Sequence, residues 1–303
     1  MTTTATVRLW GTDIGAVSIG DVGDAAIFQY EPTFVGSGIE VAPITMPLDH
    51  RIYTFPTLGW EAFRGLPGLL SDSLPDKYGN ALIDTWLAAQ GRTPESFNAV
   101  ERLCYIGKRG MGALEFVPAA GPVSAHGDEL QVAALVALAS QVLAARTDLK
   151  LKLDSALTTD SLQDILSVGT SAGGARAKAV IAWNPSTQVV RSGQIEAGDG
   201  FEYWLLKLDG VSENRDKELA DAKGYGAIEY AYSLMARAAG IEMAECRLLE
   251  EGGRKHFMTK RFDRRADGEK VHMQTLGAIA HFDLNLAGAY SYEQAIMVMR
   301  RLE

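Results

Sequence analysis

The sequence has few cysteines, no surplus of positive charge and no long apolar run. Its two cysteines, Cys104 and Cys246, are too few for a disulfide framework and lie in apolar contexts typical of buried thiols. The net charge of -9 excludes a general attraction to nucleic acid or to an anionic membrane. The most apolar helix-like run, residues 133–139, is too short to cross a bilayer, and the N-terminus lacks the basic and apolar regions of a signal peptide. We therefore expect a cytoplasmic protein in a reducing compartment, with no membrane partner.

A zinc site is not indicated either. The five histidines show no ligand spacing with the two cysteines; they are His50, His126, His256, His272 and His281. No internal repeat period is evident. With 303 residues, 47% of them hydrophobic and 22% charged, the composition is that of an ordinary globular protein of about two domains.

The pattern of apolar residues and turn signals predicts a mixture of sheet and helix. Period-two alternation predicts a small antiparallel sheet in residues 6–34, and the prolines between residues 32 and 67 argue against long helices there. A first helix is expected after Ser73 as N-cap, with Pro75 in its first turn and Gly91 as its stop. A helix over residues 93–103, a strand over 113–117, a helix over 129–146 and a strand over 256–262 follow. Near the end of the sequence, Ser291 could cap a helix with Gln294 at N3, and Ala295, Met299 and Leu302 would form its buried face.

A loop of small residues, Gly169 to Gly174, lies between two apolar segments and is followed by Arg176 and Lys178. Glycines let backbone N–H groups approach an anion, and nearby cations add charge, so the stretch is typical of a phosphate-binding loop. The match to the Walker A pattern fails, because Ala175 and Arg176 stand where Lys and Ser/Thr are required. From this loop alone, a plain glycine-rich hairpin turn explains the pattern equally well.

The segment F-E-Y-W-L-L-K-L (residues 201–208) predicts a strand that carries Lys207 on the face of Tyr203 and Leu205. Two explanations are open: the lysine extends to solvent, or a carboxylate holds it so that its ammonium faces a phosphate. Glu229, in a helix predicted over residues 227–239, offers such a carboxylate. A glycine loop, a strand lysine and a helix glutamate follow each other in this order in the ATP sites of kinases.

Two blocks of sequence resemble the N-terminal region of the HipA family. These are G-L-L-S-D-S-L-P-D-K-Y-G-N-A-L-I-D (residues 68–84) and Y-I-G-K-R-G-M-G-A-L-E-F-V-P (residues 105–118), which precede the glycine loop in the expected order. HipA proteins are serine/threonine kinase toxins of bacterial type II toxin–antitoxin pairs. The resemblance extends over essentially the whole chain.

The resemblance implies an α+β, two-lobed kinase-like fold. It divides the chain into an N-terminal subdomain (1–118), a linker with a packing helix (119–149), and a nucleotide-binding lobe with the start of the C-terminal lobe (150–303). It also implies ATP and Mg²⁺ as cofactors, a protein substrate, and a HipB-like DNA-binding antitoxin as partner. DNA would be contacted only indirectly, through that antitoxin.

The resemblance also assigns residues to the nucleotide site. Lys207 would hold the phosphates and Glu229 would orient it. The hinge that pairs with adenine would fall on Lys260 to Phe262, at the R-F-D-R-R match (residues 261–265). Ser171 would be the autophosphorylated loop serine, with Ser167 and Thr170 as alternatives. The alternative is that Ser171 only caps a turn. The remaining nucleotide-binding residues implied are Gly173, Gly174, Ala175, Arg176, Ala177, Lys178, Lys260, Arg261 and Phe262.

The catalytic loop of a kinase is not identified in the sequence. Such a loop supplies an Asp base and a metal-binding Asn, followed by a second metal-binding Asp, and no D-x-H-x-x-N pattern occurs in the 303 residues. The family's equivalent motif would lie beyond residue 303, as would the Mg²⁺ ligands. We therefore expect a truncated, split or frameshifted form, with the helical C-lobe largely missing, that is a kinase by family but inactive alone. The alternative is a non-catalytic module that binds an antitoxin or senses a nucleotide.

Overall fold

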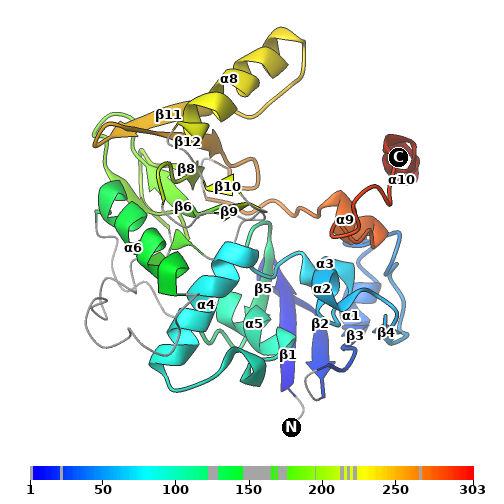
Figure 1. Ribbon diagram of the computed structural model, residues 1–303. Helices are drawn as coiled ribbons and strands as arrows, with labels where there is room; N and C mark the ends of the chain where they lie inside the picture. The colour runs from blue at the N-terminus through cyan, green and yellow to red at the C-terminus, as the bar shows by residue number, and fades with distance from the viewer. Residues whose placement is uncertain are drawn as a thin grey trace. The chain divides into compact units, whose positions relative to one another are not determined.

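The computed structural model is a mixture of helices and antiparallel sheets (Figure 1). It describes residues 3–20, 23–121, 129–145, 165–166, 168–169, 176–194, 196–211, 215–216, 219–220, 224–265 and 268–303. The chain divides into two compact units, each assembled from separate segments. The first comprises Met1–Leu74, Glu95–Gly121 and Lys270–Glu303, and the second comprises Pro75–Pro94 and Pro122–Glu269.

The first unit is built on a five-stranded antiparallel sheet in the order β4-β3-β2-β1-β5. Along β1, Ala5, Val7 and Leu9 are buried and alternate with more exposed residues. Trp10 and Gly11 join β1 to β2, and both have the positive φ of a two-residue hairpin turn. The predicted antiparallel sheet is confirmed. Its strands are β1 (Thr3–Leu9), β2 (Thr12–Ile19), β3 (Ile27–Tyr30), β4 (Tyr53–Thr54) and β5 (Leu114–Val117).

The helices of the first unit are short wherever prolines are frequent. Three of them span four residues each: α1 (Pro32–Val35), α2 (Trp60–Phe63) and α3 (Gly68–Ser71). The helix expected over residues 93–103 is instead a 3₁₀ turn, Pro94–Ser96, followed by α5 (Ala99–Ile106). Asn98 and Glu101 form a capping box that begins α5. The later helices of this unit are α9 (Leu276–Ala280) and α10 (Tyr292–Arg300).

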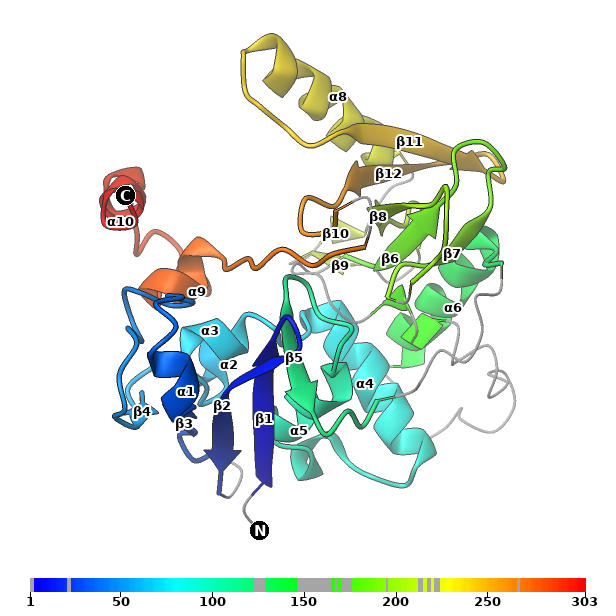
Figure 2. The same cartoon turned by 180° about the vertical axis from the view of Figure 1, so that it is seen from behind.

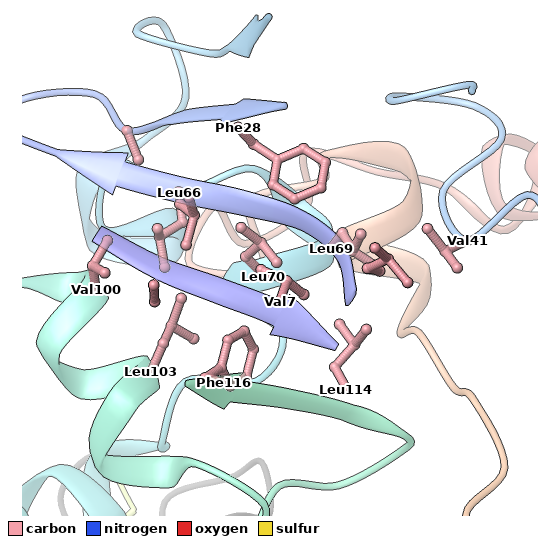
Figure 3. Close-up of a cluster of buried hydrophobic side chains, with 14 of the residues drawn as sticks. Val7, Phe28, Val41, Leu66, Leu69, Leu70, Val100, Leu103, Leu114 and Phe116 are labelled. Carbon is pink, nitrogen blue, oxygen red and sulfur yellow. The ribbon is translucent and has the colours of Figure 1, made fainter. Parts of the chain in front are cut away.

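The core of the first unit lies between the sheet and helices that include α3 and α5 (Figure 3). Val7 of β1 and Phe116 of β5 contribute side chains from neighbouring strands, while Val100 and Leu103 come from α5. All four are fully buried. Burial of apolar area at roughly 25 cal/mol per Å² makes this cluster the main stabilising contribution to the unit.

The second unit contains a five-stranded antiparallel sheet in the order β11-β12-β8-β6-β7. Helices α6 and α8 lie on opposite sides of it (Figures 1 and 2). The strands expected over residues 201–208 and 256–262 are confirmed as β8 and β12, although β12 ends before Phe262. The elements are α4 (Lys77–Ala89), α6 (Val132–Ala145), β6 (Lys178–Trp183), β7 (Val190–Ser192), β8 (Glu202–Lys207), β9 (Arg215–Asp216), β10 (Leu219–Ala220), α8 (Tyr225–Ala238), β11 (Cys246–Glu251) and β12 (Arg254–Lys260).

The two units differ from the division of the chain into 1–118, 119–149 and 150–303. Residues 75–94 belong to the second unit because Tyr78 and Leu82 of α4 pack into its core. Residues 270–303 belong to the first unit, where the Lys270 Nζ lies 2.7 Å from the Glu115 Oε1. Sequence order could not reveal this exchange, because both segments are placed by contacts between residues far apart in the chain.

Two details of the expected helices are wrong. The N-cap of α4 is Asp76 rather than Ser73, since the Asp76 carboxylate accepts a hydrogen bond from the Gly79 N–H at 2.7 Å. Helix α10 begins at the expected Ser291–Gln294 capping box, but its expected buried face is not formed. Met299 and Leu302 are exposed, Ala295 is only partly buried, and Val298 is the buried residue of this helix.

Within the part of the chain that the structure describes, none of the helices has both the length and the apolar character needed to cross a bilayer.

We expect Phe116→Ala to loosen the first unit, because truncation of a buried phenylalanine typically costs about 3–5 kcal/mol. The readout is labelling of Cys104 by a thiol reagent, followed by mass spectrometry. Cys104 is buried, and burial, aided by Glu101, raises the pKa of its thiol to about 11, so it reacts only when the unit opens. Its labelling rate should rise about a hundredfold or more, since 1.4 kcal/mol corresponds to a factor of about ten.

Cys246, which lies in the second unit, is the internal reference for this experiment, and Ile27→Ala is the matched control because Ile27 is exposed on β3. Equal acceleration of both cysteines in Phe116→Ala would contradict the division into two units.

Candidate functional site

Two lysines lie directly opposite each other on neighbouring strands of the second unit. Lys178 begins β6 and Lys207 ends β8, and the antiparallel register pairs these two residues. Paired residues point to the same face of a sheet, with Cβ atoms about 4.5–5.5 Å apart, and like charges in this arrangement repel. Each lysine therefore requires a compensating negative charge.

The carboxylate that compensates Lys207 comes from α8. The Glu229 Oε2 lies 2.5 Å from the Lys207 Nζ, and the Glu229 Oε1 lies 3.9 Å from a guanidinium nitrogen of Arg176. Arg176 also stacks on Tyr225, with the guanidinium carbon 3.9 Å from the ring centroid. The side chains of Lys207, Glu229 and Arg176 are all partly exposed, so the cluster is accessible to a ligand.

The carboxylate that compensates Lys178 comes from the residue before α4. Asp76 pairs with the Lys178 ammonium, and both side chains are almost fully buried, at 7% and 3% exposure. Burial raises the pKa of Asp76 and lowers the pKa of Lys178, while their mutual attraction opposes both shifts. Loss of one partner from such a buried pair typically costs about 3–5 kcal/mol.

These five side chains carry an uneven charge. Among these five described side chains, three are cations (Arg176, Lys178 and Lys207) and two are carboxylates (Asp76 and Glu229). A partly exposed cluster with surplus positive charge and several N–H donors attracts an anion such as a phosphate group. Sequence reasoning selected four of the five residues and missed Asp76.

The start of α8, and with it Glu229, is fixed to the sheet by buried polar contacts. The Asp209 carboxylate accepts hydrogen bonds from the Gly224 N–H at 3.0 and 3.2 Å. The Asp209 N–H in turn donates to the His256 Nδ1 at 2.9 Å, and burial lowers the pKa of His256, so its ring stays neutral and can accept. Gly224 has a φ of +107°, which favours glycine.

Close packing of α8 on β12 depends on a second glycine. A Cβ placed on Gly226 would lie 2.0 Å from the carbonyl oxygen of Lys255. Beyond this contact, a groove of about 520 Å³ opens between α8 and the strands β11 and β12. Its lining residues include Glu229, Tyr232, Cys246 and Phe257.

The residues implied as the adenine hinge make other contacts. The Lys260 N–H donates to the Glu245 O, and the Arg261 N–H donates to the Tyr203 O, so both amides take part in sheet contacts. The Arg261 guanidinium forms two hydrogen bonds with the buried Asp263 carboxylate, at 2.9 and 2.6 Å. Phe262 exposes 69% of its surface. The R-F-D-R-R segment thus contains a buried arginine–aspartate pair, and adenine binding here stays a prediction.

Several predicted site residues lie outside the described part of the chain. They are Ser167, Thr170, Ser171, Gly173, Gly174 and Ala175. Ala177 is described, fully buried, and its carbonyl oxygen accepts from the Leu208 N–H at 3.1 Å. The phosphate loop and the autophosphorylated serine therefore stay predictions, whereas the two cations that follow the loop have defined positions.

The glycine loop also contains one match to a catalytic motif. Residues 169–173, G-T-S-A-G, have the G-x-S-x-G spacing of a hydrolase nucleophile elbow. That elbow connects a strand to a helix, whereas here helical residues Ile165, Leu166 and Val168 precede the loop and β6 follows it. The order of elements does not fit a hydrolase.

His281 and Asp283 also match a motif, the H-x-D spacing of kinase catalytic loops. In the first unit, however, the His281 Nε2 accepts from the Gly68 N–H at 3.0 Å, and its ring packs on Phe55. Asp283 accepts from the Asn285 N–H at 2.9 Å. These local contacts give both residues a structural role. Among the residues that the structure describes, no group of three or more His, Cys, Asp or Glu side chains is arranged to hold a metal ion.

We expect Gly226→Ala to displace α8 from β12, because the added methyl group would collide with the Lys255 carbonyl oxygen. Labelling of Cys246, which lines the groove beside α8, should become faster than in the unmodified protein. Ala231→Gly, at an exposed position of the same helix, is the control. Helix propensity alone favours alanine over glycine by about 1 kcal/mol, so faster labelling in the control than in Gly226→Ala would contradict this account.

Comparisons with known proteins give two family matches. The HipA N-terminal domain model matches residues 5–117, and the HipA-like C-terminal domain model matches residues 170–303. The second match shows that the chain includes sequence of the C-terminal domain, so the expectation that the C-lobe is largely missing is not confirmed. A search of curated proteins found no match.

Among solved structures, the chain is similar to a chain of the HipA, HipB and operator DNA complex of the Shewanella oneidensis MR-1 toxin–antitoxin system. The sequence identity is 17% and the TM-score is 0.49, over 89% of this chain and 53% of the other. The present chain thus spans about half the length of that relative. The two domain models, matched in their expected order along the sequence, carry the assignment: the chain belongs to the HipA family.

Proposed function

We propose that the second unit binds ATP and that the protein is a HipA-type serine/threonine kinase toxin. The observation that carries the proposal is the partly exposed cluster of Lys207, Glu229 and Arg176, with the buried Lys178–Asp76 pair on the neighbouring strand. Family membership adds support, because the HipA family is kinase-like and kinase ATP sites pair a strand lysine with a helix glutamate.

The roles of the residues follow from their contacts. The Lys207 ammonium can donate to a phosphate oxygen while it keeps its hydrogen bond to Glu229, since an ammonium has three donors. Glu229 orders both Lys207 and Arg176 before the ligand arrives, which lowers the entropy lost on binding. Lys178 adds positive potential from the neighbouring strand. These residues fit the phosphate chain of a nucleotide, which would supply a transferable phosphoryl group when bound.

Phosphate transfer is a separate step in this proposal. An Asp base and metal-binding Asn and Asp residues are required for it, and no D-x-H-x-x-N pattern occurs in these 303 residues. We propose that the chain binds nucleotide without transferring phosphate. Ser171 remains the proposed autophosphorylation site.

We further propose a small HipB-like antitoxin as the partner of this protein, and a cytoplasmic location. Family membership supports this partner. With a net charge of -9 the chain is unsuited to bind DNA strongly by itself, so any DNA contact would come through the antitoxin. A module that binds the antitoxin or senses a nucleotide, with no catalytic role, is the alternative function.

We expect the chain to bind ATP and Lys207→Ala to weaken this binding by roughly tenfold to a hundredfold, as for loss of a charged hydrogen bond. Isothermal titration calorimetry with ATP and Mg²⁺ measures it. Lys255→Ala is the matched control, because Lys255 is an exposed lysine of β12 that pairs with Glu250 at 3.3 Å. Absence of binding by the unmodified chain, or equal losses in both variants, would contradict the proposal.

We also expect no phosphate transfer by the 303 residues alone, because the D-x-H-x-x-N pattern of a kinase catalytic loop does not occur among them. The test is incubation with radiolabelled ATP, Mg²⁺ and a generic protein substrate. Incorporation above that of Lys207→Ala would overturn this expectation and indicate that the base lies within the chain.

A further inference from the structure

The buried pair of Asp76 and Lys178 lies next to the proposed phosphate site without being part of the glycine loop or the hinge. Asp76 stands 102 residues before its partner and is carried by the segment that begins α4. Lys178 is 3% exposed, so its side chain is not simply extended to solvent. Burial and the neighbouring Lys207 both favour the neutral form of Lys178.

The groups that surround Lys178 decide whether it stays charged. Asp76, from the start of α4, and Glu229, from α8, favour the ammonium, while burial and Lys207 on β8 disfavour it. Arg176 pairs with Glu229 and adds a further positive charge to the cluster. Asp76 makes the direct contact, so it is the main group that opposes the loss of the proton.

We propose that Asp76 is a positioning residue of the phosphate site: it keeps Lys178 charged and fixed beside Lys207, so that both ammonium groups contribute to anion binding. This inference rests on the proposed ATP-binding function. Asp76 does not face the ligand itself. It acts through Lys178, and it couples the start of α4 to strand β6 of the sheet.

The substitution that isolates this role is Asp76→Asn. Asparagine caps helices about as well as aspartate does, so its side-chain oxygen can still accept from the Gly79 N–H and α4 keeps its start. What is lost is the negative charge beside Lys178. Without that charge, burial lowers the pKa of Lys178, so that the ammonium loses its proton at a lower pH than in the unmodified protein.

The test is ATP affinity, measured by calorimetry at a series of pH values from 6 to 10, about the range in which a buried lysine titrates. The unmodified protein should show little change in affinity over this range from Lys178. Asp76→Asn should bind about tenfold more weakly at the upper end than at the lower end, as for loss of one positive charge next to the phosphates. Asp72→Asn is the control, because Asp72 is a carboxylate that bonds Thr275 in the first unit, away from the lysine pair.

A purely structural role for Asp76 predicts a loss of stability without a new pH dependence of affinity. Parallel profiles for Asp76→Asn and the unmodified protein would therefore overturn the inference and leave the proposed function intact. Failure of the unmodified protein to bind either ATP or inorganic triphosphate would overturn the proposed function, and the role of Asp76 with it. A titration of Lys178 in Asp76→Asn, followed by NMR of labelled lysine side chains, should show its lowered pKa without any nucleotide.

Discussion

The second unit depends on one electrostatic constraint: two lysines face each other on adjacent strands, and each needs its own carboxylate. Lys207 obtains Glu229 from α8, and Lys178 obtains Asp76 from the start of α4. The sheet and these two helices are therefore tied together by charge as well as by apolar packing. Because repulsion between like charges is avoided only with both carboxylates in place, the cluster is ordered before any ligand binds.

The surrounding structure serves the same arrangement. Asp209 and His256 hold the Gly224 N–H at the start of α8, and Gly226 lets the helix approach β12 closely enough for Glu229 to reach Lys207. Arg176, stacked on Tyr225, adds the third cation. The result is a partly exposed site with surplus positive charge in a protein whose net charge is -9.

Sequence reasoning identified features made by residues close together in the chain and missed contacts between residues far apart. The strand of Lys207 and the helix of Glu229 follow from periodicity, and their order along the chain suggested the pair. Asp76 was not identified because its partner Lys178 is 102 residues away. It is the N-cap of α4, near the position where Ser73 was expected as the cap. The division of the chain was likewise hidden, since residues 75–94 and 270–303 are placed by long-range contacts. The exposed face of α10 shows that periodicity predicts an apolar face but not what covers it.

The central claim is that the surplus charge of this cluster receives the phosphates of a nucleotide. The most direct measurement is an experimental structure of the protein with ATP bound. We predict a phosphate oxygen within about 2.7–3.2 Å of the Lys207 Nζ, with the contact between Lys207 and Glu229 retained. ATP bound away from Lys207, or a Lys207–Glu229 pair with no phosphate beside it at saturating ATP, would contradict the account.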